Sequence, residues 1–518
     1  MLLHVKAFIY IILVLIISVN YEKFWMFWEL FPKEVYVSFH ELLSSLTLCT
    51  QGLFHWGEAV TRDEFGCNFS KEKSELVIGI LSAPENFAQR EAARSTWLKD
   101  YASDKKNSVK AWFVIGNHFC KIPPDYRLSK YGCEKWNVNI SDLEESFYTS
   151  LEMFPETCCS NLVHNFYPGF SFQVQYPVVI SKLGILSSLF LPNKKIKVAI
   201  LDIQTKEILV QTTMSANKST PVHGYVYAEV EKFVLPKHYE GMVFIEGYLK
   251  TSVCSKMIWN NGGGVITYKR VYPTASHMDS IKFSSEHFVA ASVEFSIPEM
   301  NKLKDIAVRE ELITAEWHSH LDNLKTKLEL EKQQNNDILL VDVTDTYRNL
   351  PRKLLSFYKW LEYGHKFSYV MKTDDDCVID ILSILQKLQS SSVFHSERPC
   401  LWSSFRKEWN VNYIGKWADY DYRSPFYPAF PCGAVYLLSH KAATWISSNA
   451  EYLFPYQGED VSMGIWLSAI NADFIQDDNF KCDLECNSES YNRAQLTLDQ
   501  IYEVWHLFEK CQNLCTCK

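Results

Sequence analysis

The sequence predicts an α/β domain that is interrupted by an inserted antiparallel β module and preceded by an N-terminal transmembrane helix. Three observations lead to this fold class. A buried strand, a helix and a second buried strand follow one another between residues 76 and 116. Short alternating runs, separated by turn residues, occupy residues 160–295. Buried strands and amphipathic helices then return from residue 337 onward.

The first strand–helix–strand unit is recognised from its apolar pattern. LVIGILSAP (76–84) is a buried strand that ends in a turn, and VKAWFVIG (109–116) is a second buried strand. Between them NFAQREAARSTWLKDY (86–101) has helical spacing, with Asn86 at the position of an N-cap and Trp97 expected in the core. Because strands joined through a helix pair in parallel, this unit predicts the start of a parallel sheet.

The inserted segment has the pattern of antiparallel β structure. Runs such as IKVAILDI and GMVFIEGYL alternate in polarity, and Gly262–Gly264 supply a turn signal. The pattern predicts a small sandwich or barrel. Residues 298–336 follow as a charged amphipathic stretch, which predicts one surface helix or a helix pair.

The α/β pattern resumes at DILLVDVTDTY (337–347), followed by the helix NLPRKLLSFYKWLEYG and the strand FSYVMKT. The chain is therefore expected to contain a cytoplasmic tail (1–4), a signal anchor (5–22), a stem (23–74), the first part of the α/β domain (75–155), the β module (160–295) and the second part of the α/β domain (298–518).

The N-terminus carries a candidate membrane segment. Residues 8–19, FIYIILVLIISV, are uncharged, and no small-residue cleavage pattern follows, so an uncleaved signal anchor is favoured over a signal peptide. The run is shorter than an ordinary span of about 20 residues, which suits the thinner membranes of the early secretory pathway. We expect a single-pass type II protein of the endoplasmic reticulum or Golgi membrane with a luminal body.

Cysteines and sequons agree with a luminal body. The 15 cysteines fit an oxidising compartment, and their odd number leaves at least one without a partner in the chain. For the cysteines beyond residue 480, disulfides are favoured over zinc, because C-x3-C and C-x-C are not the usual zinc spacings. Candidate glycosylation sites occur at Asn68, Asn139 and Asn217. With a net charge of −9 and no basic stripe, no nucleic-acid partner is expected.

Three consecutive carboxylates, Asp374, Asp375 and Asp376, follow the strand FSYVMKT. Ligands of open α/β sheets bind at the carboxyl ends of strands, which is where this triplet falls. Asp374 and Asp376 are one residue apart and point in similar directions, so they are candidate ligands of Mg²⁺ or Mn²⁺. Such an ion also takes phosphate oxygens. The alternative is a solvated acidic turn.

A second carboxylate pair lies in Gly458-Glu459-Asp460, at the start of an apolar helical pattern. Negative charge in the first turn of a helix is favoured by the helix dipole, which is one explanation. The other is a general base held close to a metal-bound leaving group.

Five blocks in fixed order make the chain similar to the β-1,3-glycosyltransferases of glycosyltransferase family 31. They are REAARSTW (90–97), VDVTDTYRNLPRK (341–353), YVMKTDDDCVID (369–380), YPAFPCGAVYLLS (427–439) and EDVSMGIWL (459–467). Five ordered blocks are a more specific signal than any one of them. The large insertion and the cysteine-rich ending resemble a branch of the family that transfers N-acetylgalactosamine.

The resemblance implies a GT-A type nucleotide-sugar transferase domain that inverts the anomeric configuration. It implies a UDP-sugar donor, UDP-GalNAc in the branch just named, and a glycan acceptor on a glycoprotein. That acceptor would be a terminal β-N-acetylglucosamine, in protein O-mannosyl glycan synthesis. Mn²⁺ (or Mg²⁺) would bridge Asp374, Asp376 and the diphosphate, Asp375 would contact the nucleotide, and Asp460 would be the catalytic base.

The resemblance also implies supporting roles for residues in the other blocks. Arg90 and Arg94 would reach the nucleotide or a phosphate, with an ion pair to Glu85, Glu91 or Asp100 as the alternative. Lys353 would also bind the nucleotide, with a solvated helix lysine as the alternative. Gly433 and Glu459 would line the acceptor or donor pocket. The alternative functions are an inactive GT-A-like glycan-binding protein and a β-1,3-transferase that uses another donor sugar.

One histidine is a further candidate metal ligand. Many GT-A enzymes supply a C-terminal histidine to the ion, and His506 is the one histidine beyond Asp460. It lies in the helix-like segment YEVWHLFEK, so it is the weaker of the metal predictions.

Overall fold

The computed structural model describes residues 74–101, 108–139, 151–153, 157–158, 166–190, 193–215, 220–246, 256–257, 259–272, 281–284, 287–362, 364–391, 394, 398–413 and 415–517. The predicted tail and signal anchor, and the stem up to residue 73, lie outside these residues. Among the helices that are described, none has the length and apolar character needed to cross a membrane. Of the candidate glycosylation sites, Asn139 is described and exposed, and Asn68 and Asn217 are not described.

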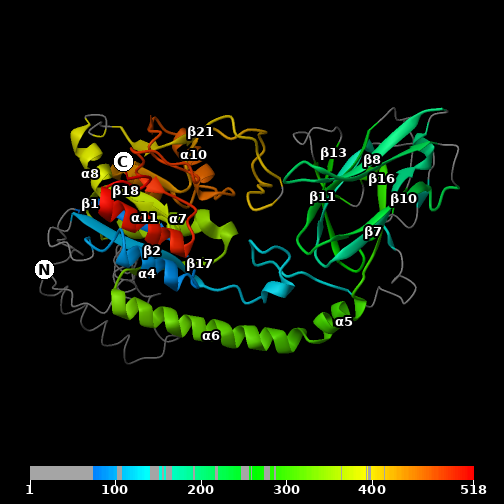
Figure 1. Ribbon diagram of the computed structural model, residues 1–518, viewed down its shortest axis with the longest axis horizontal. Helices are drawn as coiled ribbons and strands as arrows, with labels where there is room; N and C mark the ends of the chain where they lie inside the picture. The colour runs from blue at the N-terminus through cyan, green and yellow to red at the C-terminus, as the bar shows by residue number, and fades with distance from the viewer. Residues whose placement is uncertain are drawn as a thin grey trace, which may run out of the picture. The chain divides into compact units, whose positions relative to one another are not determined.

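A seven-stranded mixed sheet forms the centre of the α/β part of the chain (Figure 1). Four of its strands are parallel neighbours, as the sequence predicted, and β23 runs antiparallel to both of its neighbours. The strand order is β17 (Ile338–Thr344), β2 (Val109–His118), β1 (Ser74–Leu81), β18 (Phe367–Asp374), β23 (Val435–Ser439), β20 (Cys400–Ser403) and β24 (Asp473–Gln476).

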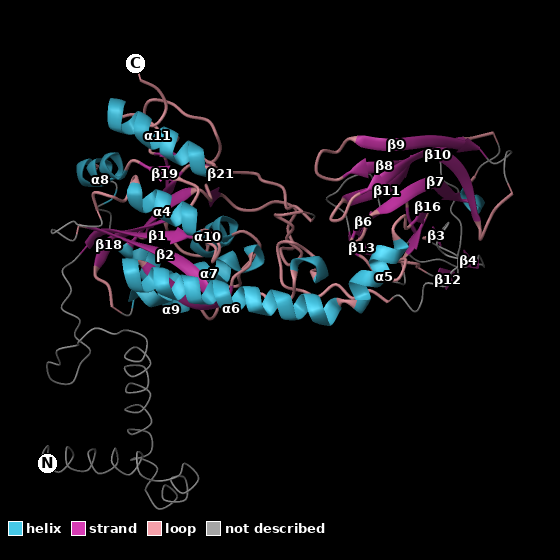
Figure 2. Ribbon diagram, turned by 60° about the horizontal axis from the view of Figure 1, so that its bottom comes forward, coloured by secondary structure: helices cyan, strands magenta, loops and turns pink. Residues whose placement is uncertain are grey.

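Helices cover both faces of this sheet, which gives three layers (Figure 2). Successive strand residues point to opposite faces, so Ile78 and Ile80 pack on one side and Val77 and Leu81 on the other. The first face packs against α4 (Phe87–Ser95), α8 (Ile381–Ser390) and α11 (Leu498–Cys511). The second face packs against α7 (Leu350–Glu362), α9 (His440–Asn449) and α10 (Glu459–Ser468).

The predicted antiparallel module is a sandwich of two sheets. One sheet has the order β10 (Tyr225–Leu235), β7 (Val178–Leu186), β16 (Ala291–Ser296) and β3 (Leu151–Glu152). The other has the order β14 (Ile281–Lys282), β13 (Ile266–Tyr272), β6 (Gly169–Val174), β11 (Glu240–Glu246), β8 (Lys195–Asp202) and β9 (Ile208–Ser215).

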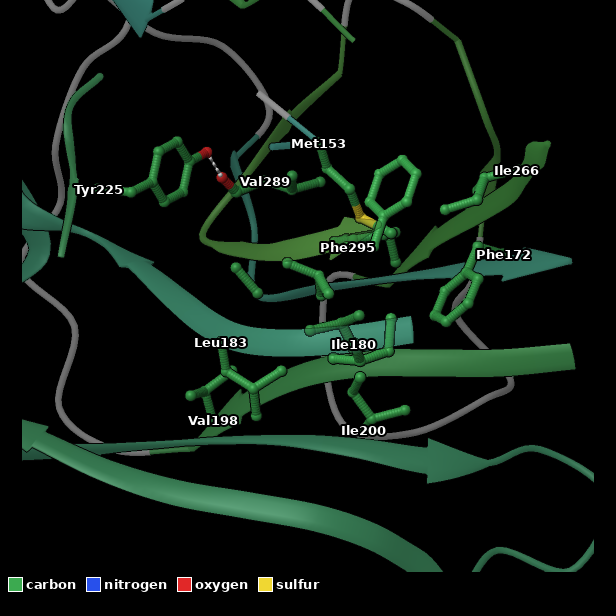
Figure 3. Close-up of a cluster of buried hydrophobic side chains, with 14 of the residues drawn as sticks. Met153, Phe172, Ile180, Leu183, Val198, Ile200, Tyr225, Ile266, Val289 and Phe295 are labelled. Carbon is green, nitrogen blue, oxygen red and sulfur yellow. Dashed lines mark hydrogen bonds between the residues drawn. The ribbon is translucent and has the colours of Figure 1, made fainter. Parts of the chain in front are cut away.

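Side chains from both sheets form one apolar core in this module (Figure 3). Leu183 and Ile180 of β7 meet Val198 and Ile200 of β8, each with no exposed surface. The hydroxyl of Tyr225 enters the same core, and it donates a hydrogen bond of 3.0 Å to the carbonyl of Val289. The buried polar group is therefore satisfied, as a core requires. This core is separate from the two cores that flank the mixed sheet.

The remaining strands and turns are short. They are the two-stranded pairs β4 (Thr157–Cys158) with β12 (Lys256–Met257), β5 (Phe166–Tyr167) with β15 (Phe288–Val289), β19 (Val378–Ile379) with β25 (Asn492–Arg493) and β21 (Phe405–Arg406) with β22 (Phe430–Pro431), and the 3₁₀ turns η1 (Pro124–Tyr126), η3 (Ser187–Leu189) and η5 (Tyr347–Asn349).

The charged stretch after the module is a helix pair, which was one of the two expectations. α5 (Met300–Val308) and α6 (Glu310–Asn335) are separated at Arg309. The buried face of α6 carries Leu321, Leu324 and Leu328 at helical spacing, and the next position on that face is Glu331. A carboxylate therefore stands where the pattern calls for an apolar side chain.

The helix predicted over residues 86–101 is shorter than expected. α4 ends at Ser95, and Thr96 has a non-helical backbone. Trp97, beyond the helix, is buried as predicted. Its large apolar side chain accounts for the misplaced boundary, because a core tryptophan after a helix continues the apolar pattern of that helix.

Disulfides join the C-terminal cysteines, as predicted in preference to zinc. The pairs are Cys432–Cys482, Cys486–Cys515 and Cys511–Cys517, and a fourth disulfide, Cys120–Cys133, lies earlier in the chain. Within the described part of the chain, Cys377 and Cys400 are free and buried. The Cys432–Cys482 bond fixes the residue before Gly433 to the C-terminal segment, close to the predicted site.

A glycine in α10 provides a test of how tightly this helix is packed. A Cβ at Gly464 would lie 2.5 Å from Cβ of Phe430 and 2.6 Å from the carbonyl oxygen of Ala429. We expect Gly464→Ala to lower the free energy of unfolding by about 1–3 kcal/mol through overpacking, measured by chemical denaturation. Gly364→Ala is the matched control, because a Cβ there has no atom within 4 Å. Equal stability of the two variants would contradict this packing.

Candidate active site

The site lies where the carboxyl ends of β1 and β18 meet the first turn of α10. In the parallel pairing of these strands, Leu81 is opposite Asp374. The backbone N–H of Asp375 donates to the carbonyl of Leu81 at 3.3 Å. The residue after β1, Ser82, is consequently brought next to the acidic triplet, although the two are far apart in the sequence.

A buried lysine, Lys372, connects β18 to α10. Its ammonium lies 2.8 Å from Oδ1 of Asp374 and 2.7 Å from Oε1 of Glu459, and it also donates to the carbonyl of Gly433. Lys372 has no exposed surface. Burial lowers its pKa, but Asp374 and Glu459 raise it further, so the net shift is upward and the ammonium stays charged.

Burial also raises the pKa of Asp374, and Lys372 lowers it in part. The neighbouring carboxylates Glu459 and Asp376 add to the upward shift, because like charges disfavour ionisation. Negative charge therefore accumulates here beyond what Lys372 neutralises. Additional positive charge at this position would stabilise the ionised carboxylates.

Asp375 is held by side chains from the other strand end. Its Oδ2 accepts hydrogen bonds from Oγ of Ser82 at 2.6 Å and from Nδ2 of Asn86 at 2.9 Å. Burial raises the pKa of Asp375, while these two hydrogen bonds lower it. Asn86 occupies the predicted N-cap position of α4, but its side chain makes no cap hydrogen bond and binds Asp375 instead. With Oδ2 occupied in this way, Oδ1 is the oxygen of Asp375 available to a ligand.

Asp376 is half-buried, and its backbone carbonyl accepts a hydrogen bond from the N–H of Leu496 at 3.0 Å. Across the described residues, no group of three or more histidine, cysteine or acidic side chains is placed to hold a metal ion. His506 is exposed on α11 and is not gathered with the aspartates. Two carboxylates without a third protein ligand fit a hard cation of the Mg²⁺ or Mn²⁺ type, which takes its other oxygens from water and phosphate.

Asp460 is in the first turn of α10, and its Oδ1 accepts a hydrogen bond from the N–H of Val461 at 2.8 Å. A Cβ at Gly433 would lie only 2.9 Å from its Oδ2, and one at Gly458 2.8 Å from its Oδ1. Glycines on both sides therefore leave space for the carboxylate. Burial and the neighbouring Glu459 raise the pKa of Asp460 to about 7. A carboxyl with this pKa can accept a proton near neutral pH.

The guanidinium of Arg90 binds partners within the protein. Its side chain is fully buried and forms an ion pair of 2.7 Å with Glu331. Nε and Nη2 donate to Glu331, Nη1 to Ser82 and to the carbonyl of Ala83, and Nη2 also to the carbonyl of Pro84. All five N–H groups of the guanidinium are thereby used, and none remains for a phosphate. The prediction of direct binding is corrected for this residue.

Arg94 belongs to the same ion-pair cluster as Arg90, because both guanidinium groups contact Glu331. Its guanidinium contacts Glu331 and Asp337, each at 2.7 Å. These partners are not the acidic neighbours considered from the sequence, apart from a longer contact of 3.7 Å to Glu91. Arg94 therefore joins α4 to the end of α6, and its predicted contact with a nucleotide stays a prediction.

Lys353 is neither solvated nor directed at an open pocket. It is buried in α7, with Nζ 3.0 Å from the carbonyl of Ser82 and 2.7 Å from Oδ2 of Asp345. The same Asp345 oxygen accepts the N–H of Gly116 at 2.6 Å. Lys353 thus ties together the ends of β1, β2 and β17, and the structure gives it a supporting role next to the site.

Comparison with known proteins places the chain in a family. It is 32% identical over 499 residues to a UDP-GalNAc:beta-1,3-N-acetylgalactosaminyltransferase 2 of Xenopus tropicalis, which covers 94% of this chain and 98% of that protein. The chain belongs to glycosyltransferase family 31. The family model described as Galactosyltransferase matches residues 318–478, a range that contains the acidic triplet and Asp460.

Other members of the family match to different extents. The human protein of the same name is 32% identical over 462 residues, covering 86% of this chain and 89% of that protein. A mouse Beta-1,3-galactosyltransferase 6 is 31% identical over 171 residues, or 33% of this chain and 52% of that protein. The match to the two N-acetylgalactosaminyltransferases thus extends through the inserted β module, whereas the match to the galactosyltransferase covers 33% of this chain.

Several site residues were missed in the sequence. Lys372 could have been found, because the two-residue period of a strand puts it on the same face as Asp374. Ser82 had no such signal, since only the pairing of β1 with β18 brings it to Asp375. Tyr347 was also missed: burial raises its pKa, and the charges of Glu459 and Asp460 raise it further.

We expect Lys372→Met to lower the free energy of unfolding by about 3–5 kcal/mol, because it leaves Glu459 and Asp374 without their cation. Methionine keeps the length of the apolar stem. The control is Lys359→Met, which removes an exposed pair with Glu451 at 3.7 Å and should cost at most about 1 kcal/mol. Denaturant titration measures both, and similar losses would show that Lys372 has no special role.

Proposed function

We propose that this member of glycosyltransferase family 31 transfers N-acetylgalactosamine from UDP-GalNAc to a terminal β-N-acetylglucosamine on a glycoprotein, forming a β-1,3 linkage. The donor sugar is supported by the names of relatives that match 86% or more of the chain. The observation that carries a transferase activity is the placement of Asp460 beside the acidic end of β18, with Lys372 between Asp374 and Glu459. A product glycan on O-mannosylated protein is part of the same proposal.

Asp374 and Asp376 would hold a Mn²⁺ or Mg²⁺ ion, with the diphosphate and water as the remaining ligands. When bound, the ion supplies charge neutralisation for the departing UDP. Two carboxylates and the excess negative charge near Asp374 support this assignment. Asp375 would face the nucleotide with Oδ1, because Ser82 and Asn86 occupy its Oδ2.

Asp460 would be the catalytic base. Its Oδ1 is oriented by the N–H of Val461, and its Oδ2 lies next to Gly433, where a side chain would block approach. The carboxylate would take the proton of the acceptor hydroxyl as its oxygen attacks the anomeric carbon and the bond to UDP breaks. A single displacement converts the α-linked donor into a β-linked product. A base of matched pKa contributes roughly 10²–10⁴-fold to such a step.

The proposed location is the endoplasmic reticulum or Golgi membrane, as a single-pass type II protein with a luminal catalytic part. The disulfides support an oxidising compartment. The proposed partners are therefore UDP-GalNAc and a luminal glycoprotein, together with the membrane that would hold the N-terminal anchor.

We expect the full-length protein to use UDP-GalNAc in preference to UDP-galactose and UDP-N-acetylglucosamine, with Mn²⁺ and a β-N-acetylglucosamine-terminated acceptor. Asp376→Asn and Asp460→Asn should each lower kcat by about 100-fold or more, because one removes a metal ligand and the other the base. The control is Asp322→Asn, an exposed carboxylate on α6. Product analysis by mass spectrometry measures all of them. Full activity in both site variants would contradict the mechanism, and preference for another sugar would contradict the donor.

The pH profile should report Asp460. Because burial and Glu459 raise its pKa to about 7, the ionised form that accepts a proton is lost as the pH falls through that value. We expect kcat to be level above this pKa and to fall about tenfold per pH unit below it. Initial rates between about pH 5 and pH 8 test this. A level rate down to about pH 5 would indicate that Asp460 does not act as the base or has an ordinary pKa.

A further inference from the structure

A buried carboxylate on α6 meets the buried guanidinium of Arg90. Glu331 is 9% exposed and follows Leu324 and Leu328 on the packed face of the helix. Arg90, on α4, has no exposed surface. Because a charge is costly to bury unless it is paired and fully hydrogen-bonded, each of these groups depends on the other.

One edge of the Arg90 guanidinium binds Glu331, and the remaining nitrogen binds the segment after β1. One edge, Nε and Nη2, takes both carboxylate oxygens of Glu331 at 2.7–3.1 Å. The other nitrogen, Nη1, donates to Oγ of Ser82 at 2.9 Å and to the carbonyl of Ala83 at 2.6 Å. The planar fork is therefore fixed at both ends, which the single ammonium of a lysine could not reproduce.

Ser82 connects Arg90 to Asp375 through two hydrogen bonds. Its oxygen accepts the N–H of Arg90, so its own hydrogen is free for another acceptor, and Oδ2 of Asp375 lies 2.6 Å away. A continuous series of hydrogen bonds thus runs from Glu331 through Arg90 and Ser82 to Asp375. It begins on the helix that follows the inserted β strands in the sequence and ends in the acidic triplet.

We propose that Glu331 and Arg90 are positioning residues for the donor side of the site. They act through Ser82, which together with Asn86 fixes which oxygen of Asp375 faces the nucleotide. This inference rests on the proposed function, in which Asp375 contacts the nucleotide of a UDP-sugar. The role differs from direct phosphate binding, because Arg90 has no N–H left for a ligand.

The neighbouring ion pair supplies a comparison within the same region. Asp337 binds Arg94 through Nε at 2.7 Å and Nη2 at 2.9 Å, so it too forms a forked pair with α4. Arg94 also donates to Oε1 of Glu331 at 2.7 Å, but Ser82 receives its hydrogen bond from Arg90. Asp337→Asn keeps both arginine contacts of Glu331, so it should loosen α4 without altering the carboxylate of Asp375.

The test uses the full-length protein with Mn²⁺, and UDP alone is the probe for binding. Glu331→Gln and Ser82→Ala are each expected to weaken UDP binding and to raise the KM for the UDP-sugar by about tenfold, as for loss of one hydrogen bond to a charged group. The KM for the acceptor should not change. Asp337→Asn, the matched control, should lower the melting temperature as Glu331→Gln does but leave UDP binding unchanged.

Three results would overturn the inference. Unchanged UDP binding in Ser82→Ala would do so. Because this variant keeps the Arg90–Glu331 pair, it tests the inference even if Glu331→Gln fails to fold. Equal weakening in Asp337→Asn would show general loosening of α4. Asp375→Asn distinguishes failure of the positioning role from failure of the nucleotide assignment: if it weakens UDP binding and the other variants do not, only the positioning role fails. If Asp375→Asn binds UDP normally, the nucleotide assignment fails as well.

Discussion

The ammonium of Lys372 is the contact on which the rest of the candidate site depends. It joins the end of β18, the first turn of α10 and the backbone at Gly433 through Asp374, Glu459 and a carbonyl. Without a cation at this point, the carboxylates of two separate segments would face each other in a buried space, and their repulsion would oppose the packing of α10 on the sheet. The lysine thus allows a strongly acidic site to form before any ligand arrives.

The donor side uses the same physical device. Arg90 and Glu331 neutralise each other in the interior, and the geometry of the guanidinium then orders Ser82 and Asp375. In both places a buried cation pairs with a carboxylate from a segment distant in the sequence, Glu459 for Lys372 and Glu331 for Arg90. Such pairs contribute little net stability compared with apolar packing, but they fix the direction of the polar groups around them. That direction is what a site for a charged nucleotide requires.

Much of the fold followed from local pattern. Buried strands, the alternating runs of the β module and the position of Asp374–Asp376 at a strand end could be recognised because each depends on neighbouring residues. The disulfides of the C-terminal segment also agreed with expectation. The end of α4 was misplaced, since the core residue Trp97 continued the helical pattern beyond the helix. The anchor and most of the stem lie outside the described residues.

The sequence by itself determined which residues are concentrated at the site, namely the acidic triplet, Asp460 and Gly433. Only the tertiary structure decided which charges neutralise one another. Arg90 pairs with Glu331, and Lys372 with Glu459, through contacts that arise when β18, α4, α6 and α10 pack together. An ion pair in the interior depends on the position of two backbones in space, and a motif that contains only one partner cannot specify it. For this reason the local chemistry could be predicted and the long-range pairing could not.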